Sequence, residues 1–290
     1  MTTFLDVRVS PVGGNPALNV AVNEGTSLAN YTGVTLSEFQ NGILGKHLLI
    51  ATHGFNVDRE SGIACLSNWE GLLHLPAPSA FLGLLWPGDS VWLHGLDYPE
   101  EPRVANEVGA VVAPFLDAQC AGAASISLAS HSLGARVVLE TAIQMKRRVR
   151  RAILMAGAID DDCLAAEFQD AVGQIDAISV LASKKDLVLA AAFPLGNFFG
   201  GVLTAGHPWF HAALGRDGPS SPPPANFLSP FEIPDGWDFG HLDYLRVSGP
   251  PPAVVPIPAI VPAPGTPPPA GGGNGWHEAW TAAFCSTRFT

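Results

Sequence analysis

The chain has 290 residues, a formal net charge of −11, 47% hydrophobic residues and only 14% charged residues. This length suits one large domain, and the apolar content is that of a globular protein with a buried core. The acidic charge argues against DNA, RNA and anionic membranes as partners, because all three carry negative charge themselves.

The N-terminal residues, MTTFLDVRVSPVGGNP, lack the basic and apolar regions of a secretory signal, so we expect a cytoplasmic protein. We also expect no integral membrane contact, because no stretch is long and apolar enough to span a bilayer. The cysteines Cys65, Cys120, Cys163 and Cys285 are widely spaced and predict neither a zinc site nor a disulfide framework. Buried free thiols are expected, and disulfides are the alternative if the mature protein is exported.

Short apolar runs alternate with amphipathic segments in the first two thirds of the chain. Continuous apolar runs are typical of parallel strands that are covered on both faces. We therefore predict an α/β fold with a doubly wound, mostly parallel sheet and right-handed crossovers. The expected strands are 47–53, 90–97, 125–132, 151–158 and 177–183, and the expected helices are 60–74, 102–119, 133–147 and 160–172.

A basic run, KRRVRR at 146–151, falls where a helix is expected to end and a strand to begin. Cations are favourable at the C-terminus of a helix. We therefore interpret the run as structural, and not as a localisation signal or a nucleic-acid patch.

Beyond about residue 187 the pattern changes. We predict one domain over residues 1–247, in which residues 190–236 are an insertion that acts as a lid or cap over the sheet. The prolines of residues 248–275 exclude a helix or a central strand and predict an extended segment. Residues 276–290 predict a C-terminal helix that docks on the domain. The insertion contains scattered aromatic residues: Phe193, Phe198, Phe199, Trp209, Phe210, Phe227 and Phe231.

The stretch SISLASHSLGARV at 125–137 places Ser132 where a buried strand turns into a helix. A serine followed two residues later by glycine at such a turn is typical of a nucleophile elbow. The turn lifts the hydroxyl clear of the sheet, and the helix N-terminus favours developing negative charge. Ser130 takes the place of the usual first glycine and is small enough for strand and helix to approach. Ser132 is the candidate nucleophile, and an ordinary buried turn serine is the structural alternative.

A second segment, HGFN at 53–56, directly follows the expected strand 47–53. The glycine lets the backbone turn, so the N–H of Phe55 can face a reacting carbonyl beside the N–H of Leu133. Two such donors form an oxyanion hole, and the loss of one typically costs about 10²- to 10³-fold in rate. His53 and His131 are expected to shape their turns and not to act as bases.

Two further polar residues complete the predicted site. Asp186, in SKKD, follows the expected strand 177–183, and His241, in WDFGHLDYL, follows a glycine. Ser132 needs a base to remove its proton, and His241 needs a carboxylate to hold its tautomer. The chain order serine, aspartate, histidine is that of a nucleophile-elbow hydrolase. Alternative acids lie after the preceding strand, where they could instead cap a helix: Asp160, Asp161 and Asp162.

These four segments resemble the α/β-hydrolase superfamily. Within it they are similar to a bacterial group with an H-G-[FY]-N oxyanion segment, an [AG]-H-S-[LM]-G elbow and a G-H-x-x-Y histidine loop. The resemblance covers about residues 45–246 and implies a sheet of the α/β-hydrolase type. Ser130 and the proline-rich tail depart from the pattern. The matching residues are HGFN at 53–56, SHSLG at 130–134, the acid of SKKD at 183–186 and GHLDY at 240–244.

The set predicts a serine hydrolase that cleaves carboxylic esters through an acyl-enzyme, as esterases and lipases do. Ser132 would attack, His241 would transfer protons and Asp186 would orient His241. No metal or organic cofactor is required. The alternatives are acyl transfer or amide cleavage with the same three residues, and a non-catalytic binding protein of the same fold.

The expected partner is a small ester with an apolar acyl or aromatic group. We predict that Phe198, Phe199, Trp209 and Phe210 wall its pocket and form part of a lid. The alternative is that these aromatic residues only anchor a long loop.

Other polar residues in this part of the chain are assigned no chemistry. His207 and His211 could share a helical face and bind a metal, but no third ligand lies near them in the sequence. His94 and Asp97 are expected to border the pocket. No metal site is predicted.

Overall fold

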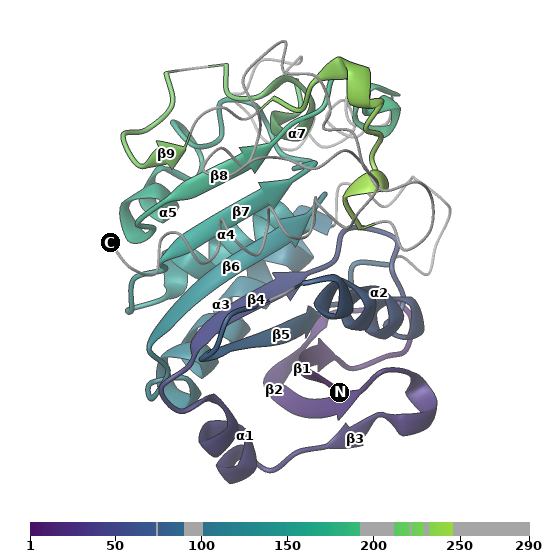
Figure 1. Cartoon of the computed structure of the whole chain (residues 1–290), viewed down its shortest axis with the longest axis vertical. Helices are drawn as coiled ribbons and strands as arrows, with labels where there is room; N and C mark the ends of the chain where they lie inside the picture. Colours follow the sequence, from purple (N-terminus) through teal and green to yellow (C-terminus); the bar gives the residue numbers. More distant parts are fainter. Residues whose placement is uncertain (74, 90–100, 192–211, 221, 229–231, 246–290) are drawn as a thin grey trace.

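The computed structural model describes residues 1–73, 75–89, 101–191, 212–220, 222–228 and 232–245 (Figure 1). In this part of the chain, nine strands form one sheet in the order β3-β2-β1-β5-β4-β6-β7-β8-β9. In the part of this order that runs from β1 through β5 to β9, every neighbouring pair is parallel, whereas the pairs β1–β2 and β2–β3 are antiparallel. The predicted α/β fold with a mostly parallel sheet is confirmed.

The elements follow one another as strands and crossover helices. The strands are β1 (Thr2–Arg8), β2 (Pro16–Gly25), β3 (Thr32–Gly33), β4 (His47–Thr52), β5 (Ser79–Leu85), β6 (Ser125–His131), β7 (Arg151–Met155), β8 (Ile178–Leu181) and β9 (Phe227–Leu228). The α-helices are α1 (Leu36–Ile43), α2 (Arg59–Leu72), α3 (Glu101–Gln119), α4 (Gly134–Gln144), α5 (Gln169–Gln174) and α7 (Leu214–Asp217). Three short 3₁₀ helices are η1 (Leu28–Asn30), η2 (Asp235–Trp237) and η3 (Asp243–Leu245).

Helices cover both faces of the sheet. In Figure 1, α2 lies in front of the strands, while α3 and α4 lie behind them and pack against each other. The central strands are therefore buried on both sides, and every residue of β7 and β8 is buried. This burial explains why these strands appear in the sequence as continuous apolar runs.

The expected helix at 160–172 is wrong. Turns occupy most of this segment, and α5 begins only at Gln169. The backbone of Asp160 and Asp161 pairs instead with a distant segment: Asp160 forms a bridge with Ala213, and the Asp161 N–H donates to the carbonyl of Ala212. The Asp161 carbonyl, which a helix would offer to the N–H of residue 165, accepts instead from the N–H of Ser220 at 3.1 Å.

Five strands in the described ranges were not expected: β1, β2, β3, β5 and β9. β1 and β2 form an antiparallel hairpin at the N-terminus, and β5 lies between β1 and β4 in the sheet. The expected strand at 90–97 lies outside the described residues. Two other strands are shorter than predicted: β7 ends at Met155, where Ala156 has a φ of 45°, and β8 ends at Leu181.

The basic run after α4 binds carbonyl groups at helix ends, although not at the end of α4 itself. The Arg147 guanidinium donates to the carbonyls of Cys120 and Ala123, just beyond α3. The Arg148 guanidinium donates to the carbonyl of Gly173, in the last turn of α5. Cations at these positions complement the partial negative charge of a helix C-terminus.

The described parts of the 190–236 segment are joined to the sheet. β9 pairs in parallel with β8, and Glu232 forms a parallel bridge with Ala182. α7 packs tightly, because a Cβ added to Gly215 would lie 2.0 Å from the backbone nitrogen of Gly157. Residues 192–211 and the proposed tail elements at 248–275 and 276–290 lie outside the described residues.

Cys65, Cys120 and Cys163 are free thiols, and Cys285 lies outside the described residues. Burial raises the pKa of Cys65 to about 11 and that of Cys120 to about 12. None of the helices in the described ranges has the length and apolar character needed to cross a bilayer.

Candidate active site

Ser132 occupies a strained turn between β6 and α4. Its φ is 54°, in the left-handed region that β-carbon sterics disfavour for residues other than glycine. Neighbouring backbone holds it there: the Ser132 N–H donates to the carbonyl of Met155 at 2.9 Å, and the Ser132 carbonyl accepts from Ala158 at 3.2 Å. The residue is 7% exposed. The turn is thus fixed by β7 and the residues after it.

A chain of two hydrogen bonds joins Ser132 to Asp186 through His241. The His241 Nε2 atom lies 3.0 Å from Ser132 Oγ, and His241 Nδ1 lies 2.7 Å from Asp186 Oδ2. A carboxylate only accepts, so Nδ1 carries a proton and donates it to Asp186. Nε2 of a neutral His241 is then the acceptor for the Ser132 hydroxyl. The structure therefore brings together three of the residues that the sequence singles out.

Asp186 is fully buried, with 0% of its surface exposed. A buried carboxylate needs partners that satisfy both oxygens. Oδ2 accepts from His241, and Oδ1 accepts from the backbone N–H of Leu189 at 2.9 Å. The second bond lies in the first turn of the helical residues that begin at Leu187. The alternative acids at 160–162 lie in the turns after β7, and His241 pairs with Asp186.

The segment after β4 touches the elbow directly. A Cβ added to Gly54 would lie 2.7 Å from the Cβ of Ser132. A Cβ added to Gly134 would lie 2.5 Å from the carbonyl oxygen of His53. Both positions must therefore be glycine for the two turns to approach, and the turns that carry Phe55 and Leu133 lie against each other. Leu133 is the N-cap of α4, where the first N–H groups of a helix have no intrahelical acceptor.

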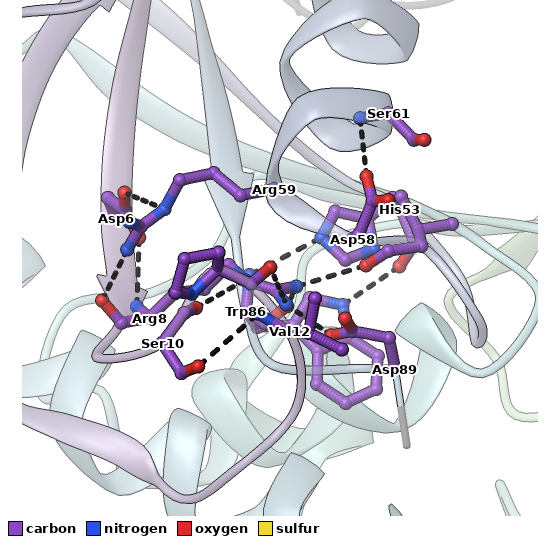
Figure 2. A network of polar contacts seen from close by, with 12 residues as sticks. Asp6, Arg8, Ser10, Val12, His53, Asp58, Arg59, Ser61, Trp86 and Asp89 are labelled. Atoms are coloured by element: carbon purple, nitrogen blue, oxygen red, sulfur yellow. Dashed lines mark hydrogen bonds and ion pairs between the residues drawn. The ribbon is translucent and has the colours of Figure 1, made fainter. Parts of the chain in front are cut away.

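The side chain of His53, which contacts Trp86 in Figure 2, also hydrogen-bonds the peptide between Gly54 and Phe55. Its Nδ1 donates to the Gly54 carbonyl at 2.9 Å, and its Nε2 accepts from the N–H of Trp86 at 3.4 Å. Burial lowers the pKa of His53 to about 3, so the ring is neutral at pH 7. In a trans peptide the carbonyl and the next N–H point in opposite directions. The Phe55 N–H therefore points away from His53.

Arg8, at the end of β1, ties three loops together beneath this segment (Figure 2). Its guanidinium donates to the carbonyls of Trp86 at 2.7 Å and of Val57 and Pro11 at 3.0 Å. It also forms an ion pair with Asp89, and the Arg8 side chain is 0% exposed. The sequence reasoning missed Arg8. The one signal was an arginine inside the apolar stretch FLDVRV, because a buried arginine requires several acceptors.

The remaining predicted site residues lie outside the described residues. These are the pocket candidates Phe198, Phe199, Trp209 and Phe210, and the unassigned residues His94, Asp97, His207 and His211. Within the described ranges, no three His, Cys, Asp or Glu side chains are grouped so that they could hold a metal ion.

All of the described site residues lie at one edge of the sheet. Arg8, Trp86, His53 and Ser132 lie at or just beyond the carboxyl ends of neighbouring parallel strands, and Asp186 follows β8. Open α/β sheets bind ligands at this edge. The arrangement has the parts that acyl transfer to a serine requires: a nucleophile, a base and an orienting carboxylate.

Comparison with known proteins adds a family. Residues 35–198, more than half of the chain, match a family described as "Alpha/beta hydrolase of unknown function (DUF900)". The match includes Ser132 and Asp186 and ends before His241. No curated protein and no solved structure matches the chain. The chain belongs to this family of α/β-hydrolases.

Proposed function

We propose that this chain is a serine hydrolase that cleaves carboxylic esters through an acyl-enzyme. The observation that carries the proposal is the linked pair of hydrogen bonds at 3.0 Å and 2.7 Å from Ser132 through His241 to Asp186. The family is one of α/β-hydrolases, and the strained φ of 54° at Ser132 is the conformation expected of a nucleophile elbow.

In the first half of the proposed reaction, Ser132 Oγ attacks the ester carbon and its proton passes to His241 Nε2. The carbonyl oxygen becomes an oxyanion, which the N–H groups of Phe55 and Leu133 stabilise. His241 then gives the proton to the leaving alcohol oxygen as the ester C–O bond breaks. The acyl group is left on Ser132.

In the second half, water attacks the acyl carbon and loses a proton to His241 Nε2. The bond to Ser132 Oγ breaks, His241 returns the proton to Oγ, and the carboxylic acid leaves. Asp186 stays ionised throughout, because its role is to hold Nδ1 protonated and to stabilise the imidazolium that forms in each half.

The surroundings suit a transient positive charge on His241. His131 lies next to it, with ring centroids 4.8 Å apart, and burial lowers the pKa of His131 to about 4. His131 is therefore neutral at pH 7 and does not oppose protonation of His241. The only charge that directly contacts the His241 ring among the described contacts is Asp186.

The test compares Ser132→Ala with Ser130→Ala in the hydrolysis of p-nitrophenyl esters. Ser130 is a buried serine two positions away in β6, whose hydroxyl donates to the Ile153 carbonyl, so its replacement controls for loss of a buried hydroxyl. We expect Ser132→Ala to lose hydrolysis and Ser130→Ala to keep it. Retention of most activity by Ser132→Ala would refute the proposal. Products formed with an added alcohol distinguish hydrolysis from acyl transfer.

A further inference from the structure

The ring of His131 links the turn that carries Ser132 to the loop that carries His241. His131 is the last residue of β6 and directly precedes Ser132. It is 5% exposed, and its Nε2 lies 2.7 Å from the backbone carbonyl oxygen of His241. A carbonyl only accepts hydrogen bonds, so His131 Nε2 carries a proton and donates it.

The contact holds His241 from both ends. Ser132 Oγ lies 3.0 Å from Nε2 of the His241 ring, and the side chain of His131 donates to the backbone carbonyl of His241. The consecutive residues His131 and Ser132 therefore both hydrogen-bond His241. The ring planes of His131 and His241 are tilted by 55°, so the two rings pack against each other without stacking.

The other described contacts of the histidine loop come from elsewhere. Ser183 Oγ donates to the Phe239 carbonyl at 2.5 Å, and the Tyr244 hydroxyl donates to the Leu181 carbonyl at 3.4 Å. The Gly240 N–H donates to Asp243 within the loop at 2.7 Å. Those bonds fix the loop relative to β8 or to itself. The bond from His131 ties the loop backbone to β6, the strand that carries the nucleophile.

The charged and titratable groups around His131 leave it one role. Asp186, His241 and Tyr244 face it from the β8 side, and the neutral His53 interacts with it from the end of β4. Its Nδ1 lies toward Gly54, where an added Cβ would be 3.3 Å away. Burial keeps the ring neutral at pH 7. The one N–H of the neutral ring is at Nε2 and is bound by the His241 carbonyl, so we assign His131 a role through this hydrogen bond.

We propose that His131 is a positioning residue that sets the distance between Ser132 Oγ and His241 Nε2 by anchoring the His241 backbone. This inference rests on the proposed function of the same site. Without the bond, the described contacts fix the loop around His241 only relative to β8 or to itself, and the alignment of the His241 ring with the Ser132 hydroxyl is lost for part of the time. A misplacement of about 1 Å can cost about 10²-fold in rate.

The test compares two substitutions of His131 with a matched histidine elsewhere. His131→Gln keeps an N–H donor close to the position of Nε2, whereas His131→Leu fills similar space without a donor. The control is His47→Gln, because His47 makes a hydrogen bond of 2.7 Å to Ser125 at the opposite end of β4 and β6. If His131→Leu fails to fold, His131→Asn replaces it, because its amide is one bond shorter and falls short of the His241 carbonyl.

Kinetics on a p-nitrophenyl ester give the first readout. We expect His131→Leu to lose about 10²-fold in kcat with KM within about threefold of wild type, because alignment and not substrate binding is lost. His131→Gln should recover at least about tenfold of that loss, and His47→Gln should match wild type. Wild-type kcat in His131→Leu, or equal losses in the Leu and Gln variants, would overturn the proposal.

A second readout does not depend on turnover. The proton shared by His241 Nδ1 and Asp186 gives a downfield NMR signal when it is protected from exchange. We expect this signal in wild type and in His131→Gln, and its broadening or loss in His131→Leu. An unchanged signal in the folded Leu variant would contradict the positioning role. If wild type hydrolyses no ester and reacts with no phosphonate, the proposed function fails, and the NMR comparison alone decides the role of His131.

Discussion

The backbone of Ser132 has a φ of 54°, a conformation that glycine adopts far more easily than serine. Two neighbouring glycines leave room for this turn. Gly54 and Gly134 lack the Cβ atoms that would collide with Ser132 and with the His53 carbonyl. The segments after β4 and β6 can then meet, and the strained turn is held by backbone bonds to Met155 and Ala158. Strain of this kind costs about 1–3 kcal/mol and persists only where surrounding structure enforces it.

The first prediction concerns Gly54. Gly54→Ala should lower kcat/KM by at least about tenfold, because the new methyl group would lie 2.7 Å from Ser132 Cβ and must push the elbow and the Phe55 turn apart. Gly71→Ala in α2 is the control, since an added Cβ there meets nothing within 4 Å. Steady-state kinetics with thermal melting checks both. Unchanged kinetics in a folded Gly54→Ala protein would show that the two turns do not need their close contact.

The second prediction concerns the acid. Asp186→Asn should lower kcat by about 10⁴-fold, because an amide can no longer select the His241 tautomer that donates from Nδ1. The measurement is the rate of ester hydrolysis for Asp186→Asn beside Asp160→Asn, Asp161→Asn and Asp162→Asn. If one of the variants at 160–162 lost most of its hydrolysis rate while Asp186→Asn stayed near wild type, the catalytic acid would lie after β7.

The site residues at the ends of strands could be predicted from the sequence, while their supporting residues could not. Ser132, Asp186 and His241 each stand in a short polar stretch beside an apolar run or a glycine, and the order of the three restricts the choice. Trp86 shows no such local signal, and Arg8 shows only its place inside the stretch FLDVRV. Arg8 and Trp86 support the site through hydrogen bonds to segments far along the chain, Arg8 to Val57 and Trp86 to His53. A single sequence does not reveal these pairings.

Among the elements, β1 supports the site from a distance. Its last residue, Arg8, holds the loops after β4 and β5 by binding the carbonyls of Val57 and Trp86. Arg59, at the start of α2, ion-pairs with Asp6 of β1 at 3.2 Å. The N-terminal hairpin is thus part of the framework beneath the HGFN segment, and not an appendage to the parallel sheet.

The third prediction tests this support. Arg8→Met should lower the free energy of unfolding by about 3–5 kcal/mol, because it leaves the buried Asp89 carboxylate and several carbonyls without their partner. Arg103→Met should cost less than about 1 kcal/mol, because its ion pair with Glu107 is half exposed on α3. Urea unfolding of both variants measures the difference. Equal losses would mean that the buried network around Arg8 adds little stability.

The strands that the sequence predicted are those buried on both faces. β4, β6, β7 and β8 stand in the middle of the sheet, and their apolar runs are nearly uninterrupted. β5 was missed although it is also central. Its Gly83 weakens the strand pattern, and the structure gives the reason, because a Cβ there would lie 2.8 Å from the ring of Phe4. The segment at 160–172 has helix-forming composition, but pairing with residues 212 and 213 decides its conformation.

For the whole molecule, two buried neutral histidines predict how stability depends on pH. Burial lowers the pKa of His53 to about 3 and that of His131 to about 4, from 6.5. Between these values and 6.5 the unfolded chain binds protons that the folded chain does not. Their contribution to stability is therefore fully present above pH 6.5 and is lost as the pH falls toward 4 for His131 and toward 3 for His53.

The fourth prediction follows from that linkage. The free energy of unfolding should fall between pH 7 and pH 5, by up to about 1.4 kcal/mol per pH unit for each of these histidines. His131→Gln should show a shallower fall, since it removes one of the two groups. Urea unfolding at several pH values measures both slopes, and identical slopes would show that His131 is protonated in the folded protein near its ordinary pKa.

The central claim is that Ser132 is a nucleophile activated through His241, and covalent labelling tests it most directly. The measurement is the mass of the intact protein, followed by peptide mapping, after reaction with an active-site fluorophosphonate. We predict one adduct per chain, on the peptide that contains Ser132, no adduct in Ser132→Ala, and strongly slowed labelling in His241→Ala. An adduct on a different residue, or no adduct on the folded wild-type protein, would contradict the claim.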